Sequence, residues 1–441
     1  MKEVQDNTAK LEKEVKRLKA ENDSLRKLLN AKRYKMADKV ANSYNVMLPV
    51  GTKRRNIVGK SLNAARRVGN IKTKRKIDSI EKLMKKYPNV LIVSGTAWNT
   101  PLPQRSHQLT KEFAKNKNLL VLYYEMDISF NKCKRLDENV MLISGRDVLF
   151  SLILDKKQNG YFMFSNVGNV ELASIKQMLK NGFELIFECI DELDEALSGG
   201  ITINQKKILK DLPNLGVKLF VSTAHRLTEQ LERIVPESKI LLSKNAVNVE
   251  KFNYERFKDG GLPADLRNIR KDGKKIIGYY GAIAPWLDYD LIHETAKRHP
   301  EYELVFIGVD YDGALAKLDT SFKNIHYLGA KKQSELPSYA VHFDCAIIPF
   351  MPGDIAKSTS PIKLFEYMAL GLPTVCTKDL NECVGYKYVY VAKNASDFEK
   401  FLQEAIGQSR DNNVKKELLA QAENNTWEYR AKEILKALGI S

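Results

Sequence analysis

From Pro88 onward, short runs rich in β-branched residues alternate with stretches of helical periodicity. This alternation is typical of α/β folds, in which crossover helices connect parallel strands. The pattern predicts ten strands, five in each half of this region: Val90–Ser94, Leu119–Tyr124, Val140–Ile143, Glu184–Cys189, Lys218–Ser222, Lys275–Tyr280, Glu303–Gly308, Ile325–Leu328, Asp344–Pro349 and Thr374–Thr377. Ligands of such sheets bind at the carboxyl ends of the strands, so we expect a site where the two halves face each other across a cleft.

The chain is long enough for several domains. A charged stretch at 258–274 contains Gly260, Gly261 and Pro263 and is the expected hinge between two Rossmann-like domains. The predicted parts are a coiled-coil dimerisation helix, a basic segment, an N-terminal acceptor domain, a C-terminal nucleotide domain and a C-terminal helix that packs back across the domains, with boundaries at 1–35, 36–86, 87–258, 259–410 and 411–441.

The net charge of +17 is concentrated at one end of the chain. Residues 1–86 carry 25 Lys and Arg against 9 Asp and Glu, whereas the remaining 355 residues are close to neutral. A basic arm of this kind binds polyanions. It contains few aromatic residues for stacking on bases, which argues against nucleic acid. We therefore expect residues 36–86 to lie on an anionic membrane surface; a solvated linker and a nucleic-acid-binding arm are the alternatives.

Residues 4–29 follow a heptad pattern. Leu11, Leu18 and Leu25 fall at position d, and Val15 and Asn22 fall at position a. Val at a with Leu at d favours two parallel strands, and a single Asn at a fixes their register. The pattern predicts a parallel homodimer, with a single charged helix docked on the body as the alternative.

The five cysteines are scattered without a C-x-x-C pair, so neither disulfides nor a zinc site are expected. The chain starts with charged residues and has no apolar run approaching ~18 residues, which predicts neither a signal peptide nor a membrane span. The expected location is cytoplasmic, peripheral at the inner face of the cell membrane.

The segment 360–375 predicts a helix followed at once by a buried strand. Ser360 is the expected N-cap, Pro361 suits the first helical position, and Gly371 ends the helix. Lys363 in the first turn and Glu366 one turn later share a face. The helix N-terminus and the lysine suit a diphosphate, and the carboxylate can accept hydrogen bonds from both ribose hydroxyls. A solvated amphipathic helix is the alternative.

This helix resembles the donor-binding helix of retaining glycosyltransferases of the family 4 type, which have the GT-B fold of two Rossmann-like domains. Other segments resemble the family in order and spacing: 244–252, 276–283, 327–329, 335–339 and 344–349, with Trp286-Leu287-Asp288 similar to a branch that acts in surface polysaccharide synthesis. The resemblance implies transfer of a sugar from a nucleotide-sugar to a cell-surface, polysaccharide or protein- or lipid-linked glycan, with retention and without a metal or other cofactor. The donor-binding residues it implies are Gly281, Asn245, Gly329, Ser360, Lys363 and Glu366.

Acceptor and catalytic residues are expected in the first half. The loop 95–107 follows the first strand and opens a helix, and it carries the candidates Trp98, Arg105 and His107 for binding the acceptor. Asp191 and Asp194 follow a predicted strand and could accept the proton of the acceptor hydroxyl or cap a helix. The predicted catalytic set is Asp191, His107 and Lys363, where Lys363 stabilises the departing diphosphate.

Two departures from the family pattern leave other functions open. The family usually has a second glutamate eight positions before Glu366, where this chain has Ser358. Ala284, Pro285 and Trp286 replace the usual Arg and Lys after the glycine turn. The alternatives are a catalytically silent partner subunit, a nucleotide-sugar epimerase on the same fold and, from the arm's charge alone, a nucleic-acid-binding protein.

Overall fold

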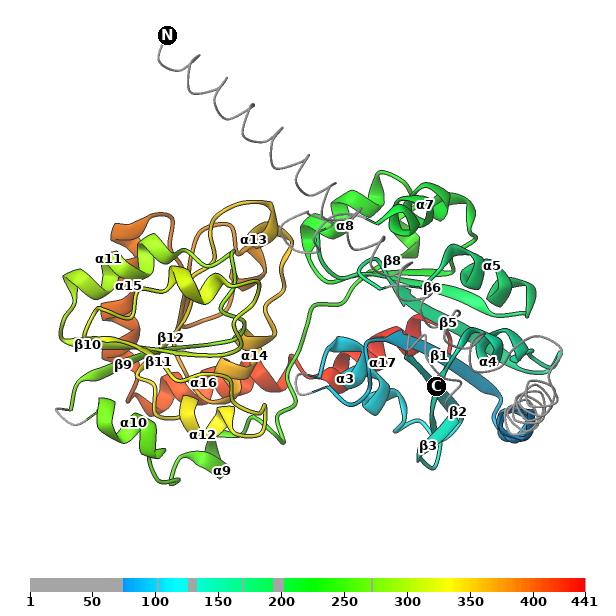
Figure 1. Cartoon of the computed structure of the whole chain (residues 1–441), viewed down its shortest axis with the longest axis horizontal. Helices are drawn as coiled ribbons and strands as arrows, with labels where there is room; N and C mark the ends of the chain where they lie inside the picture. Colours follow the sequence, from blue (N-terminus) through cyan, green and yellow to red (C-terminus); the bar gives the residue numbers. More distant parts are fainter. Residues whose placement is uncertain are drawn as a thin grey trace, which may run out of the picture. The chain divides into compact units, whose positions relative to one another are not determined.

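The computed structural model describes residues 74–100, 103–125, 133–168, 170–192, 202–270 and 273–440. Lys76–Ser441 forms one compact unit, shown in Figure 1. The predicted coiled coil at 4–29, the predicted basic segment up to residue 73, and Asp194 lie outside the described residues. Residues 74–84 are helical, and the side chains of Ile80 and Met84 are buried in the core of the first half.

The first half contains an eight-stranded sheet in the order β3-β4-β2-β1-β5-β6-β7-β8. All neighbouring strands are parallel except β3 and β4. When β3 is left aside, the first six parallel strands have the spatial order 3-2-1-4-5-6 of a Rossmann fold. The strands are β1 (Asn89–Gly95), β2 (Leu119–Glu125), β3 (Cys133–Asp137), β4 (Val140–Ser144), β5 (Asn159–Ser165), β6 (Glu184–Cys189), β7 (Leu219–Ser222) and β8 (Ile240–Leu242).

Helices cover both faces of this sheet because alternate residues of each buried strand point to opposite sides. Val90 and Ile92 of β1 belong to one hydrophobic core, and Leu91 and Val93 belong to another on the opposite face. The helices of this half are α3 (Arg105–Phe113), α4 (Arg146–Ser151), α5 (Leu172–Lys180), α7 (Ile203–Asp211) and α8 (His225–Glu232), with short 3₁₀ turns at Leu212–Asn214 and Glu237–Lys239.

The second half contains a six-stranded parallel sheet in the order β11-β10-β9-β12-β13-β14, which is again the 3-2-1-4-5-6 order. Its strands are β9 (Lys275–Tyr280), β10 (Tyr302–Ile307), β11 (Ile325–Tyr327), β12 (Cys345–Ile348), β13 (Thr374–Cys376) and β14 (Val389–Val391). Its helical segments are α9 (Tyr254–Phe257), α10 (Ala264–Ile269), α11 (Tyr289–Arg298), a 3₁₀ turn (Ala314–Lys317), α12 (Leu336–Ala340), α13 (Asp354–Ser358), α14 (Ile362–Ala369), a 3₁₀ turn (Asn381–Cys383), α15 (Ala395–Gln408) and α16 (Asn412–Glu423).

The C-terminal helices contact both halves. α16 packs against α14, whereas α17 (Trp427–Ala437) packs against α3 (Figure 1). Trp427 and Ile434 of α17 share a core with Leu109 and Phe113 of α3. The last two helices therefore connect the second half to one face of the first sheet.

All ten predicted strands are present, and the prediction of an α/β fold with two parallel sheets is confirmed. Four strands were not predicted: β3, β5, β8 and β14. The most consequential omission is β5, which is central in the first sheet. Its core is the run Tyr161-Phe162-Met163-Phe164, which is buried but has no β-branched residue. A search for β-branched runs therefore passes over it.

Candidate active site

Two residues predicted to bind the donor meet at the topological switch point of the second sheet, where the strand order reverses between β9 and β12. Gly281 follows β9 directly and has φ 144°, a conformation that side chains rarely adopt. A Cβ atom at this position would lie 2.8 Å from Cε and 2.9 Å from Nζ of Lys363. Glycine therefore leaves the space that the lysine side chain occupies.

The backbone is also close-packed at the ends of the neighbouring strands. Gly308 follows β10, and a Cβ atom there would collide with the carbonyl oxygen of Gly281. The amide of Gly308 donates to the carbonyl of Gly329, which follows β11 with φ 71° (N–O 3.0 Å). The three glycines thus place bare backbone side by side at the carboxyl ends of β9, β10 and β11, where ligands of this fold bind.

The amine of Lys363 is a partly buried cation. It lies 3.3 Å from the Tyr279 hydroxyl, 4.8 Å from the centre of the Tyr279 ring and 4.9 Å from the centre of the Phe350 ring. Burial lowers the pKa of Lys363 to about 8, although the nearby carboxylate of Glu366 acts in the opposite direction. Within the described residues no carboxylate forms an ion pair with this amine. A desolvated cation in this state suits an anionic ligand.

Glu366 lies one turn further along α14 and is 6% exposed. Burial raises the pKa of Glu366 to about 7, and the nearby Tyr280, Lys363 and Gln333 side chains limit that rise. The carboxyl group has this raised pKa because the fold removes it from water. The helix that carries both groups is held by buried apolar side chains, among them Leu364, Phe365 and Met368.

The C-terminus of α14 is as predicted. Gly371 has φ 66° and its amide donates to the carbonyl of Met368, while the amide of Leu372 donates to the carbonyl of Tyr367. These two bonds form a Schellman motif, which satisfies the last carbonyls of the helix.

The prediction that Ser360 caps α14 is wrong. The helix begins at Ile362, its N-cap is Pro361, and no side chain caps it. The hydroxyl of Ser360 instead accepts a hydrogen bond from the backbone amide of Asn245 at 3.0 Å, and its carbonyl accepts one from the Asn245 side-chain amide at 2.7 Å. Ser360 is 3% exposed, and its hydroxyl is engaged by a segment of the first half.

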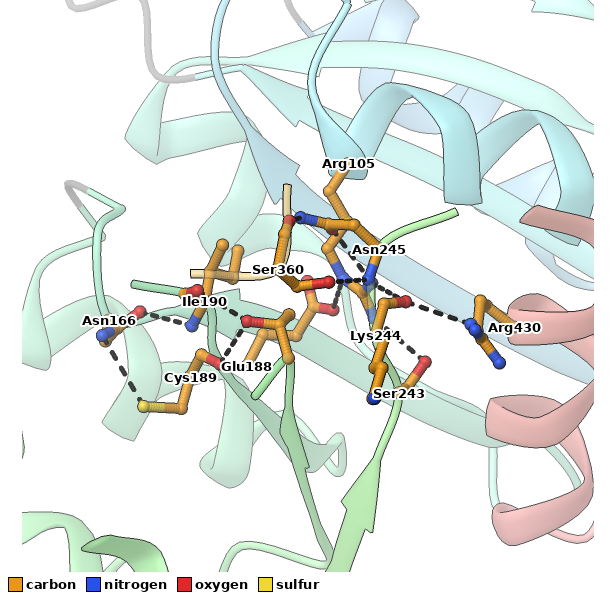
Figure 2. A network of polar contacts seen from close by, with 11 residues as sticks. Arg105, Asn166, Glu188, Cys189, Ile190, Ser243, Lys244, Asn245, Ser360 and Arg430 are labelled. Carbon is orange, nitrogen blue, oxygen red and sulfur yellow. Dashed lines mark hydrogen bonds and ion pairs between the residues drawn. The ribbon is translucent and has the colours of Figure 1, made fainter. Parts of the chain in front are cut away.

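Arg105 completes this junction, which Figure 2 shows. Its guanidinium forms an ion pair with Glu188 at 2.9 Å and donates to the Asn245 side chain at 3.4 Å. It also donates to the carbonyl of Lys244 at 3.1 Å and to the hydroxyl of Ser243 at 3.2 Å. Arg105 and Glu188 are 3% and 4% exposed in their side chains. The contacts available to this guanidinium are therefore made within the chain.

His107 and Trp98 lie beside Arg105. One ring nitrogen of His107 accepts from the amide of Gln104 at 3.0 Å, and the other lies 3.1 Å from the carbonyl of Ala97. Burial lowers the pKa of His107, which favours the neutral ring that the Gln104 contact requires. The partly buried Trp98 packs edge-on against Tyr123 with ring centres 4.8 Å apart. The structure thus uses His107 as part of a capping box at the start of α3.

Asp191 follows β6 at the carboxyl edge of the first sheet. Its carbonyl accepts from the Asn166 side chain at 2.6 Å. Figure 2 shows the second contact of this side chain, which accepts from the amide of Ile190 at 2.9 Å. Burial raises the pKa of the Asp191 carboxyl to about 6. Asn166 therefore anchors residues 190 and 191, which directly follow β6, and the carboxyl group of Asp191 has a pKa raised toward neutrality.

Sequence reasoning missed two buried carboxylates that join segments far apart in the chain. Glu188 lies in an otherwise apolar strand, and that isolated charge was the available signal. Glu382 is fully buried and accepts from the amide of His225 at 2.7 Å and from the amine of Lys244 at 2.8 Å. No local pattern marks Glu382, because its partners lie in the other half of the chain.

Comparisons with known proteins agree with the geometry of the second half. Residues 274–408, which include β9 to β14 and α14, match the family described as glycosyl transferases group 1. Residues 274–408 are therefore a group 1 glycosyltransferase domain of the family 4 type. A putative teichuronic acid biosynthesis glycosyltransferase, TuaH of Bacillus subtilis strain 168, is 23% identical over 272 residues, which are 58% of this chain and 67% of TuaH.

Solved structures resemble this glycosyltransferase in fold. Anabaena HepE in complex with UDP and glucose superposes with a TM-score of 0.55 at 11% identity, covering 80% of this chain and 100% of HepE. A trehalose-6-phosphate structure from E. coli, bound with UDP-2-fluoro glucose, superposes with a TM-score of 0.60 at 10% identity over 79% of this chain and 98% of that chain. Together with the two Rossmann-like sheets, these likenesses show a GT-B-like fold.

Two further features concern the part of this glycosyltransferase that the structure describes. None of its helices is long and apolar enough to span a bilayer. In the same residues, no three His, Cys, Asp or Glu side chains gather in a way that could hold a metal ion.

Proposed function

We propose that this nucleotide-sugar-dependent glycosyltransferase passes a sugar, with retention, to a hydroxyl group of a cell-surface polysaccharide or of a lipid- or protein-linked glycan. The observation that carries the proposal is the Lys363 amine, a partly buried cation at the Gly281 turn with no ion-pair partner among the described residues. The similarity to TuaH supports a role in polysaccharide synthesis.

The donor diphosphate would lie between the Gly281 turn and the first turn of α14. Lys363 and the N–H groups of that turn supply positive charge. This charge stabilises the diphosphate more strongly as it departs, because negative charge then builds up on its oxygen atoms. Since Ala284, Pro285 and Trp286 replace the family's usual cations, Lys363 carries this task, and we propose that no metal ion is required. Glu366 would accept hydrogen bonds from the ribose hydroxyls.

The acceptor would approach from the first half. The bond between the sugar C1 atom and the diphosphate oxygen breaks, the acceptor oxygen bonds to C1, and the acceptor proton passes to a base. Asp191, with its pKa raised to about 6, is the proposed base, because it is largely ionised at neutral pH and still basic enough to accept a proton. Arg105 and His107 contribute by shaping the loop that ends at Arg105, since their polar groups are engaged inside the chain.

The donor site is tested by calorimetric titration of the wild type with UDP-, dTDP- and GDP-sugars, in buffer containing EDTA. One donor is expected to bind saturably. Glu366→Gln should weaken that binding by about 1–3 kcal/mol, because hydrogen bonds to a charged group are lost. The matched control is Glu303→Gln, which alters a buried carboxylate of the same half that pairs with Lys274 and His326. The control should bind as the wild type does.

The absence of binding by every donor would overturn the proposal, as would equal losses in the Glu366 and Glu303 variants. Product analysis then separates transfer from epimerisation. Transfer requires an acceptor, whereas an epimerase on the same fold would release free sugar without one.

We further propose that residues 36–86 bind an anionic membrane surface and that residues 4–29 form a parallel homodimer. A chain lacking residues 1–73 is expected to lose salt-sensitive binding to anionic vesicles while it keeps donor binding. The cut is placed at 73 because Ile80 and Met84 are buried in the folded unit. Loss of both properties would contradict this division of tasks, and binding of duplex DNA by the full chain would favour the nucleic-acid alternative.

A further inference from the structure

A carboxylate lies next to the position where this chain lacks one. Ser358, which replaces the family's usual glutamate, is 1% exposed, and its hydroxyl donates to Oε2 of Glu192 at 2.6 Å. Ser358 ends α13 in the second half, whereas Glu192 follows β6 in the first half, 166 residues earlier. A carboxylate is therefore present at this point of the fold, although a different segment supplies it.

The Glu192 carboxylate is held in place by donors that leave part of it open. Gln230 donates to Oε1 at 3.0 Å and to Oε2 at 2.9 Å, and Arg226 approaches Oε2 at 3.4 Å. Arg226 is shared, since it also pairs with Asp354 at 3.0 Å. A carboxylate offers about four acceptor positions, two on each oxygen. Most of these contacts fall on Oε2, so Oε1 keeps room for another donor, and the side chain is 21% exposed.

The position of Glu192 relates it to the sugar part of the donor. If the nucleotide is held by α14 and the Gly281 turn, the sugar must point toward the first half, because the acceptor and Asp191 are there. Glu192 is the neighbour of Asp191 and contacts the segment that leads into α14. Vicinal sugar hydroxyls are donors that suit a carboxylate oxygen.

We propose that Glu192 supplies, from the first half, the carboxylate that position 358 lacks, and that it accepts hydrogen bonds from hydroxyl groups of the transferable sugar. This inference rests on the proposed donor site. It makes Glu192 a residue that distinguishes a nucleotide-sugar from the bare nucleotide, and it brings the two halves together around the sugar.

The arrangement permits only one carboxylate. A glutamate at position 358 beside Glu192 would place two negative charges in contact, and such a pair cannot both ionise without a large cost. The two positions are therefore expected to be exchangeable as a pair and incompatible when both are acidic.

The test compares a nucleoside diphosphate with its sugar conjugate, beginning with UDP and UDP-glucose and using whichever base binds. Calorimetry gives the extra affinity that the sugar provides in the wild type. Glu192→Gln should reduce binding of the nucleotide-sugar about tenfold and leave binding of the bare nucleotide unchanged, since one charged hydrogen-bond acceptor is lost. Ser358→Glu alone should produce a similar selective loss. The paired exchange E192S/S358E should recover nucleotide-sugar binding to within about threefold of the wild type.

Other results overturn the inference in distinct ways. Equal weakening of nucleotide and nucleotide-sugar by Glu192→Gln would show that Glu192 only joins the two halves. If that variant does not fold, the paired exchange still decides, because it keeps one carboxylate in place; nucleotide binding without a gain from the sugar would then contradict the proposal. If the wild type binds no nucleotide, the proposed donor site itself is wrong.

Discussion

The two halves of the molecule have the same strand order but treat their charged groups differently. At the edge of the first sheet, Arg105 and Glu188 form a buried ion pair whose remaining hydrogen bonds are satisfied within the chain. At the edge of the second sheet, Lys363 has no ion-pair partner in the described ranges, and both Lys363 and Glu366 have pKa values displaced toward neutrality. The charged groups at the first edge are paired within the chain, and we propose that Lys363 and Glu366 at the second edge bind the donor.

This difference indicates how burial should be interpreted in such folds. A buried charge with its full set of partners stabilises a junction, and its removal leaves the partner charge buried and unpaired. A desolvated charge without a partner costs folding free energy and is retained for function. Mutations in the two sets should therefore move stability in opposite directions.

The largest expected effect is on stability. Arg105→Met should lower the free energy of unfolding by about 3–5 kcal/mol, because it leaves Glu188 buried without its partner. Urea denaturation measures the change. Arg298→Met is the control, since Arg298 is exposed where it pairs with Glu294 and Glu399 and its loss should change stability far less. A loss below 1 kcal/mol in the Arg105 variant would show that its ion pair does not stabilise the junction.

Lys363→Met should give the opposite result. Transfer is expected to fall about 100-fold, as when one positioned donor is removed from a transition state. Stability at pH 7 should rise by roughly 1–3 kcal/mol, because a desolvated cation is removed. The folded-state pKa is lowered from 10.5 to about 8, so the unfolded state binds more protons between these values and the wild type gains stability as pH rises from 8 to 10.5.

The advantage of the Lys363 variant should therefore shrink over that pH range. Urea denaturation at pH 7, 9 and 10.5, together with transfer assays at pH 7, measures both effects. Lys331→Met removes an amine that is paired with Asp265 in the same half and serves as the control. A Lys363 variant that is less stable than the wild type at pH 7 would mean that this amine, like the guanidinium of Arg105, stabilises the folded chain.

The sequence predicted those parts of the fold that depend on local signals. Apolar runs predicted ten strands. Gly371 predicted the end of α14, because the residue that ends a helix often has positive φ, and glycine adopts that conformation most readily. The placement of Lys363 and Glu366 together follows from helical periodicity alone. These features need no knowledge of distant residues.

The features that the sequence could not show depend on contacts between distant segments. Serine is a common N-cap residue, but the hydroxyl of Ser360 accepts a hydrogen bond from the backbone amide of Asn245, 115 residues away. Arg105 and His107 are residue types that often bind ligands. In the structure, Arg105 donates to Glu188, and a ring nitrogen of His107 lies within hydrogen-bond distance of the Ala97 carbonyl. The local sequence cannot distinguish a side chain that binds a ligand from one that is bonded to a distant residue of the same chain.

The smallest effect tests whether space at the Gly281 turn, as well as charge, belongs to the donor site. Gly281→Ala adds a methyl group 2.8 Å from Cε of Lys363 and should shift the amine enough to weaken donor binding about tenfold. Gly313→Ala is the matched control. Gly313 also has positive φ, 70°, but nothing lies within 4 Å of an added Cβ, so this variant bears the backbone strain without touching the lysine.

Both glycine variants should lose stability, and only Gly281→Ala should lose donor affinity in calorimetry. Equal donor affinity in the two variants would show that the lysine tolerates the methyl group. The contrast between the halves would then rest on the charge of Lys363 alone. A loss confined to Gly281→Ala would support a diphosphate site at this turn, because the methyl group either displaces the Lys363 amine or fills space beside the backbone that the donor needs.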